Sequence, residues 1–172
     1  MQIIAHRGFW KSNAEKNSLI SSRRAIDLRF GVEIDIRDRL GSLVVSHDPS
    51  VQDDVCFSEF ADILFSSNAP IAINVKSDGL ATLLGEIIAE YSPKNYFAFD
   101  MSIPEMYNYS RKGIRFYTHI SDLCTKPPCI EYASGIWLDS FECLWYDTSV
   151  LKKIASYGLP ICVVSEELHS RD

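Results

Sequence analysis

Side chains able to do chemistry are concentrated in the first fifty residues, beginning with His6, Arg7 and Gly8. They follow an apolar, β-prone run at 2–6, which predicts a buried strand that ends in polar residues. Histidine can donate or accept a proton near neutral pH. Arginine can fork onto two phosphate oxygens, and glycine lets the backbone turn closely around a ligand. The tripeptide favours an anionic ligand, although a surface Arg beside an incidental His would give the same pattern.

Two carboxylates and a second histidine follow within the next forty residues. Glu33 and Asp35 lie in the apolar run 31–36, and alternation along a strand places both side chains on one face. Adjacent carboxylates repel each other unless a cation lies between them or one takes up a proton. A third apolar run at 43–46 leads to His47 and Asp48. Two histidines and an acid pair at strand ends are the components of metal-assisted acid–base chemistry.

Three motifs together resemble those of the glycerophosphodiester phosphodiesterase family: His6-Arg7-Gly8, Glu33-Ile34-Asp35 and His47-Asp48. Their order and spacing match the family over roughly residues 1–80. The resemblance implies a TIM barrel in which His6 and His47 form the acid–base pair. It also implies that Arg7 binds the phosphate and that Glu33 and Asp35 bind a divalent metal ion.

The predicted strand at 70–76 carries a departure from the family pattern. Asn74 and Lys76 share one face of this strand, where the family has Glu-x-Lys. Lys76 matches and is implied to lie near the phosphate, whereas Asn74 replaces the third metal-binding carboxylate. An amide oxygen is neutral, and Ca²⁺ accepts it while Mg²⁺ tolerates it alongside waters. We therefore expect a weakly held Mg²⁺ or Ca²⁺ ion, with water or Asp100 completing its ligands.

Apolar runs alternate with helical patterns along the whole chain, which predicts one α/β domain over 1–172 with a parallel sheet. The predicted strands are 2–6, 31–36, 70–76, 96–100, 115–120, 135–139 and 161–165, with a hairpin partner at 43–46. The predicted helices are 19–30, 55–65, 80–91, 103–110 and 147–157. A TIM barrel has eight strands in about 250 residues. The predicted barrel is therefore incomplete, with two open edges that we expect a helix or a second copy of the chain to cover.

Composition limits the classes of partner. Hydrophobic residues make up 47% and charged residues 23% of the 172 residues, as in ordinary globular proteins. A net charge of −6 argues against a broad nucleic-acid or anionic-membrane surface. The five cysteines lack paired spacing, which predicts reduced thiols and a cytoplasmic protein. No signal peptide is visible, and no apolar run reaches the roughly 18 residues of a membrane span.

The leading hypothesis is metal-dependent hydrolysis of a small phosphodiester, with a glycerophosphodiester of lipid metabolism as the substrate that the resemblance implies. The alternative is a non-catalytic protein that binds a phosphate ligand on the same barrel, as Asn74 and the missing strand suggest. The residues do not distinguish direct hydrolysis from a route through a cyclic phosphate. Asp100, His119 and Asp139 stand at further strand ends, and His169 is expected at the surface.

Overall fold

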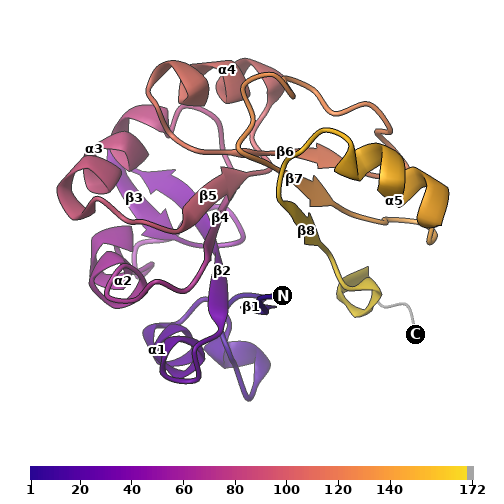
Figure 1. Cartoon of the computed structure of the whole chain (residues 1–172). Helices are drawn as coiled ribbons and strands as arrows, with labels where there is room; N and C mark the ends of the chain where they lie inside the picture. Colours follow the sequence, from indigo (N-terminus) through magenta and orange to yellow (C-terminus); the bar gives the residue numbers. More distant parts are fainter. Residues whose placement is uncertain (170–172) are drawn as a thin grey trace.

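The computed structural model describes residues 1–169, which form an α/β barrel that is open along one side (Figure 1). Its strands are β1 (Ile4–Ala5), β2 (Gly31–Arg39), β3 (Ser42–Val45), β4 (Ile71–Val75), β5 (Tyr96–Phe99), β6 (Tyr117–Ile120), β7 (Gly135–Leu138) and β8 (Ile161–Val163). Its α-helices are α1 (Leu19–Asp27), α2 (Phe57–Leu64), α3 (Ala81–Tyr91), α4 (Ile103–Arg111) and α5 (Thr148–Ala155). Two 3₁₀ helices, η1 (Asn13–Glu15) and η2 (Glu166–His169), complete the described elements.

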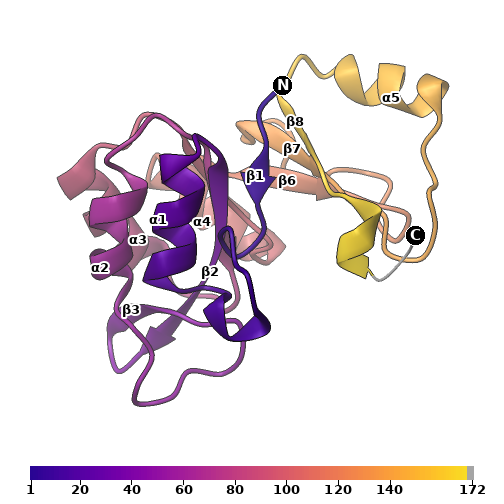
Figure 2. The ribbon, with the colours of Figure 1, turned by 90° about the horizontal axis from the view of Figure 1, so that it is seen from below.

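Seven parallel strands follow one another around the barrel. Strands β1, β2, β4 and β5 form one parallel series, and β6, β7 and β8 form a second. A parallel bridge between Ala98 and Phe116 joins β5 to the chain leading into β6. Strand β3 pairs antiparallel with β2, as the predicted hairpin requires. Within residues 1–169 no strand joins β1 to β8, so the prediction of an incomplete barrel is confirmed (Figure 2).

The two faces of the parallel strands have different partners. Outward residues of β2, β4 and β5 are apolar and pack against α1 to α4, where Phe57, Phe60 and Tyr109 are fully buried. A second cluster lies between α5 and the strands β6 to β8. Inward residues of β5 to β7 are largely aromatic, whereas those of β2 include Glu33 and Asp35 and those of β4 are Ala72 and Asn74. Strand alternation thus directs the acids of β2 and the Asn of β4 into the barrel.

The element ends follow local backbone signals. Ser18 caps α1 by accepting a hydrogen bond from the backbone N–H of Ser21. The helix ends before residue 30, because Arg29 adopts a left-handed conformation with φ of 61°. Strand β1 is shorter than the predicted run at 2–6.

All five cysteines are unpaired, and no helix within residues 1–169 is long and apolar enough to span a membrane.

Candidate active site

A tight turn after β1 places Arg7 over the end of β2. Arg7 and Gly8 both have left-handed backbones, with φ of 55° and 81°. A Cβ on Gly8 would lie 2.5 Å from the hydroxyl oxygen of Ser21, so only glycine fits between the turn and α1. The backbone N–H of Asn17 donates to the carbonyl of Arg7 at 3.0 Å and closes the loop over this turn. In the His-Arg-Gly sequence, the glycine is therefore needed to form the turn that positions the Arg7 side chain.

Asp35 is the centre of a charged cluster formed by three elements. Its carboxylate is fully buried and lies 3.0 Å from Nε of Arg7 and 3.4 Å from Nζ of Lys76. The side-chain amide of Asn17 donates to the same carboxylate at 2.7 Å. Only Nε of Arg7 is used in this cluster, and within residues 1–169 its terminal nitrogens have no hydrogen-bond partner. Asp35 thus holds the Arg7 and Lys76 side chains next to each other, while the two terminal guanidinium nitrogens of Arg7 remain available to bind an anion.

Glu33 and His6 lie next to this cluster and are both neutral near pH 7. Burial, and then the charge of Asp35, raise the pKa of Glu33 to about 8, although the backbone N–H of Arg7 and the amide of Asn74 oppose the shift. Burial, followed by the charge of Arg7, lowers the pKa of His6 to about 4. Nε2 of His6 lies 3.8 Å from Oε2 of Glu33. Because neither group is charged at neutral pH, this contact joins a free imidazole to a protonated carboxyl.

Two buried oxygens on β2 and β4, Oε1 of Glu33 and Oδ1 of Asn74, have no hydrogen-bond partner, and Oδ1 of Asp35 beside them has only the ion pair with Nζ of Lys76 at 3.4 Å. Asp35 and Asn74 are direct partners in the parallel register. Buried oxygens without donors are costly unless a cation or water satisfies them, and oxygens are the ligands that Mg²⁺ and Ca²⁺ prefer. Within residues 1–169 no three His, Cys, Asp or Glu side chains form a metal-binding group. The oxygen set therefore suits a divalent ion only with the Asn74 amide included.

His47 lies in the loop after β3 rather than inside the barrel. Its side chain is 43% exposed, and Nδ1 lies 2.9 Å from a carboxylate oxygen of Asp48. His47, Arg7 and Asn17 line a common hollow of about 470 Å³. Within residues 1–169 His6 and His47 make no direct contact. His6 directly precedes Arg7, whereas His47 only shares this hollow with Arg7, and the action of the two histidines as an acid–base pair stays a prediction.

Asp100 stands at the end of β5 with a left-handed φ of 67°. Desolvation at the barrel mouth raises its pKa, against the opposing charges of Lys76 and His119. Asp139, at the end of β7, adds to the rise. Asp100 therefore lies within electrostatic reach of Lys76 and of the strand ends of the second series. No contact with Glu33 or Asn74 is present in the described part of the chain, so its role as a metal ligand stays a prediction.

The prediction that His169 is a surface residue is wrong. The 3₁₀ helix η2 turns the chain back after β8, and Nε2 of His169 lies 2.7 Å from Oδ1 of Asp139. The imidazole also packs edge-on against Phe141, and its side chain is only 22% exposed. Thirty residues separate His169 from Asp139, so sequence spacing carried no signal for this pair. The pair fastens η2 to the same end of the barrel that carries Lys76.

Solved structures with the same arrangement of strands identify the fold. A glycerophosphodiester phosphodiesterase from Agrobacterium tumefaciens str. C58 superposes with a TM-score of 0.71 at 15% identity, covering 95% of this chain and 86% of that one. A provisionally assigned glycerophosphodiester phosphodiesterase from Galdieria sulphuraria gives 0.63 at 12% identity, with coverages of 99% and 98%. This chain has the glycerophosphodiester phosphodiesterase fold. These superpositions confirm the predicted TIM-barrel-like architecture and the predicted resemblance, at the level of the fold, to glycerophosphodiester phosphodiesterases.

The similarity to these structures establishes the fold and does not by itself establish an activity. A tryptophan synthase complex from Pyrococcus furiosus superposes with a TM-score of 0.56 at 13% identity, covering 98% of this chain and 88% of that one. Barrels of this kind serve different chemistries, which are determined by the residues at the strand ends. No family model matches the sequence, and no curated protein is significantly similar to it. The function must therefore be argued from the site.

Proposed function

We propose that this protein hydrolyses phosphodiesters at the charged cluster around Asp35. The observation that carries the proposal is the joint placement of Arg7 and Lys76 on one buried carboxylate, with neutral His6 beside them. Two cations at one point suit the monoanionic phosphate of a diester. A neutral imidazole next to that phosphate can accept a proton at physiological pH. The phosphodiesterases that share this fold support the same reaction class.

Each group has a defined role in this proposal. Arg7 and Lys76 bind the non-bridging phosphate oxygens and stabilise the charge that grows on them during attack. His6 takes a proton from the attacking water, or from a hydroxyl of the substrate in the cyclic-phosphate route. The new P–O bond forms as the P–O bond to the leaving alcohol breaks, and His47 donates a proton to that alcohol. Asn17 and Asp35 hold Arg7 and Lys76 in position.

We infer that Glu33, Asp35 and Asn74 hold the divalent cation, Mg²⁺ or Ca²⁺. Such an ion would neutralise phosphate charge and lower the pKa of a bound water. Glu33 must first lose its proton, and its pKa of about 8 makes that loss unfavourable at neutral pH. Asn74 contributes no charge. The ion should therefore bind weakly, and more tightly as the pH rises towards 8.

Hydrolysis of bis(p-nitrophenyl) phosphate with Mg²⁺ or Ca²⁺, and again after chelation by EDTA, tests the proposal. Wild-type protein should release p-nitrophenol, and the release should fall after chelation. Arg7→Gln should reduce the rate by roughly 10²–10³-fold, the usual effect of losing one charge-stabilising group. Arg23→Gln, which removes an exposed arginine of α1, is the matched control and should leave the rate unchanged. Absence of turnover by the wild type, or equal loss in both variants, would contradict the proposal.

A specific observation supports the alternative of a non-catalytic phosphate-binding protein. His47 is paired with Asp48 at the surface and makes no contact with the Asp35 cluster in residues 1–169. In that case Arg7 and Lys76 would bind a phosphodiester without breaking it. Titration calorimetry with glycerophosphocholine distinguishes the two functions, because binding without any release of choline or glycerol phosphate would favour the alternative.

A further inference from the structure

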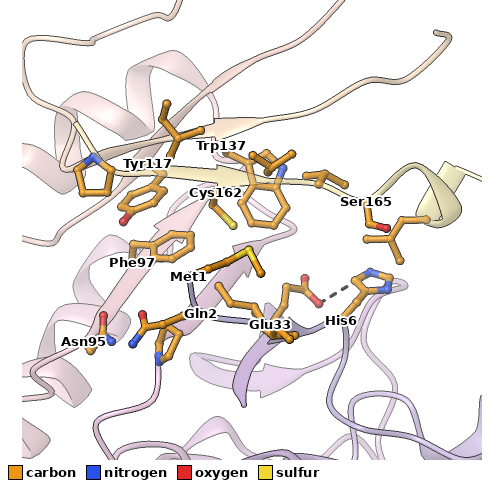
Figure 3. A pocket seen from close by; sticks show the side chains of 18 residues that line it. Met1, Gln2, His6, Glu33, Asn95, Phe97, Tyr117, Trp137, Cys162 and Ser165 are labelled. Carbon is orange, nitrogen blue, oxygen red and sulfur yellow. Dashed lines mark ion pairs between the residues drawn. The ribbon is translucent and has the colours of Figure 1, made fainter. Parts of the chain in front are cut away.

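A cavity of about 500 Å³ lies along the open side of the barrel, between β1 and β8. Its walls include Ile4 of β1, which packs against the inner aromatic cluster. Phe97 of β5, Trp137 of β7 and Cys162 of β8 also line it and point into the barrel (Figure 3). A closed barrel of eight strands fills its interior with side chains. Here β1 and β8 are not joined, so the space stays accessible from the side. Its volume falls within the roughly 300–1,000 Å³ of small-molecule sites.

The cavity has rigid aromatic walls and an apolar rim. Phe97 stacks on Tyr117 with ring centroids 3.7 Å apart, and Phe99 stacks on Trp137 at 3.9 Å. These pairs fix the depth of the cavity, because neither ring can turn without breaking its stack. At the rim, the exposed apolar side chains are Ile3, Val163 and Leu168. Apolar side chains gathered around an opening mark a site for an apolar ligand or partner.

The inner end of the cavity is the candidate active site itself. His6 and Glu33 line the cavity and also adjoin the Arg7 and Lys76 cluster (Figure 3). The other ionisable side chains in the lining are Tyr117 and Cys162, and burial raises the pKa of both, that of Cys162 to about 11. Away from His6 and Glu33, the lining consists mainly of apolar and aromatic side chains, among them Ile4, Phe97 and Trp137. A hydrocarbon chain loses no hydration in such a space, whereas a charged group would.

We propose that this cavity binds the hydrocarbon chain of an amphiphilic phosphodiester whose phosphate lies at Arg7 and Lys76. The inference rests on the proposed function for the position of the phosphate, and it names the substrate class as diesters with one long alkyl or acyl chain. Continuity between the cavity and the cluster selects this occupant, because a chain attached to the phosphate passes His6 and Glu33 directly into the apolar space. A segment of a second chain copy would have to enter between the same residues and would exclude the substrate's own chain.

Titration calorimetry with a series of alkyl phosphocholines tests the inference, using methyl, butyl, octyl and dodecyl chains below their critical micelle concentrations. Each methylene buried is worth up to about a fourfold gain in affinity, so octyl phosphocholine, with four more methylenes, should bind up to about 250-fold more tightly than butyl. Val163→Asp, on the rim, should remove most of this gain. Leu40→Asp is the matched control, since Leu40 is an exposed side chain of the β2–β3 turn outside the cavity.

A second variant is needed because Val163→Asp could lose binding simply by disturbing the fold. Cys162→Phe fills the cavity from within and should weaken octyl phosphocholine while leaving methyl phosphocholine unchanged. Affinity independent of chain length, or equal losses in Val163→Asp and Leu40→Asp, would overturn the inference. A dimer in light scattering that binds no octyl phosphocholine would assign the cavity to a second copy instead. Chain-dependent binding without any hydrolysis would uphold the cavity and refute only the catalytic proposal.

Discussion

Replacing the Glu33 carboxyl by an amide should stabilise the protein at neutral pH. The folded protein holds the Glu33 proton up to about pH 8, whereas the unfolded chain loses it near the ordinary value of 4.5. Between these values the unfolded state binds fewer protons, so this group makes the wild type less stable as the pH rises. Glu33→Gln removes the ionisation and keeps an oxygen for the backbone N–H of Arg7, which now donates to Glu33 at 2.9 Å.

The size of the effect follows from the two pKa values. Between the two pKa values, each pH unit lowers the free energy of unfolding of the wild type by about 1.4 kcal/mol. The free energy of unfolding of Glu33→Gln should therefore exceed that of the wild type by about 3 kcal/mol more at pH 7 than at pH 5. In a chain of this length that corresponds to roughly 6–12 °C in Tm. Thermal denaturation of both proteins at each pH measures it, and Glu131→Gln, which removes an exposed carboxylate, is the control. A constant difference in Tm across this range would show that Glu33 is already ionised in the folded protein.

Three further predictions concern the histidines and the ion. His6→Ala and His47→Ala should each lower turnover by roughly 10²–10⁴-fold with an unchanged circular dichroism spectrum, and near-normal activity in both would refute their pairing. Because the pKa of His6 is lowered to about 4, the loss of kcat/KM through its protonation should have its midpoint near pH 4, and a midpoint near 6.5 would show an unperturbed histidine. Asn74→Glu should tighten Mg²⁺ or Ca²⁺ in titration calorimetry, whereas identical affinities would place Asn74 outside the ligand set.

The parts of the site that follow from strand periodicity could be predicted from the sequence. Alternation placed Glu33 with Asp35, and Asn74 with Lys76, and parallel pairing of β2 with β4 brings the two pairs together. Counting strand-like runs was enough to predict an open barrel, because each run is separated from the next by a helical or turn pattern. These features depend on local pattern and on a short list of topologies.

The parts that depend on long-range geometry could not be predicted. The ion pair of Arg7 with Asp35 requires the left-handed turn at Arg7 and Gly8, whose direction is set by close packing against α1. The pair of His169 with Asp139 requires η2 to fold back over the end of β7. The raised pKa of Glu33 arises from complete burial, which a strand pattern does not specify for one residue. The cavity is determined by how the aromatic side chains stack next to the gap between β1 and β8.

Phosphorus NMR of a phosphodiester incubated with the protein tests the central claim most directly. The diester would be glycerophosphocholine or a lysophospholipid, with Mg²⁺ or Ca²⁺ present, and the comparison would be between wild type and His6→Gln. With the wild type, the diester signal should give way to a monoester, either directly or through the distinct signal of a cyclic phosphate. His6→Gln should leave the diester signal almost unchanged over the same time. A diester that persists with the wild type, or disappears equally fast with His6→Gln, would contradict hydrolysis at this site.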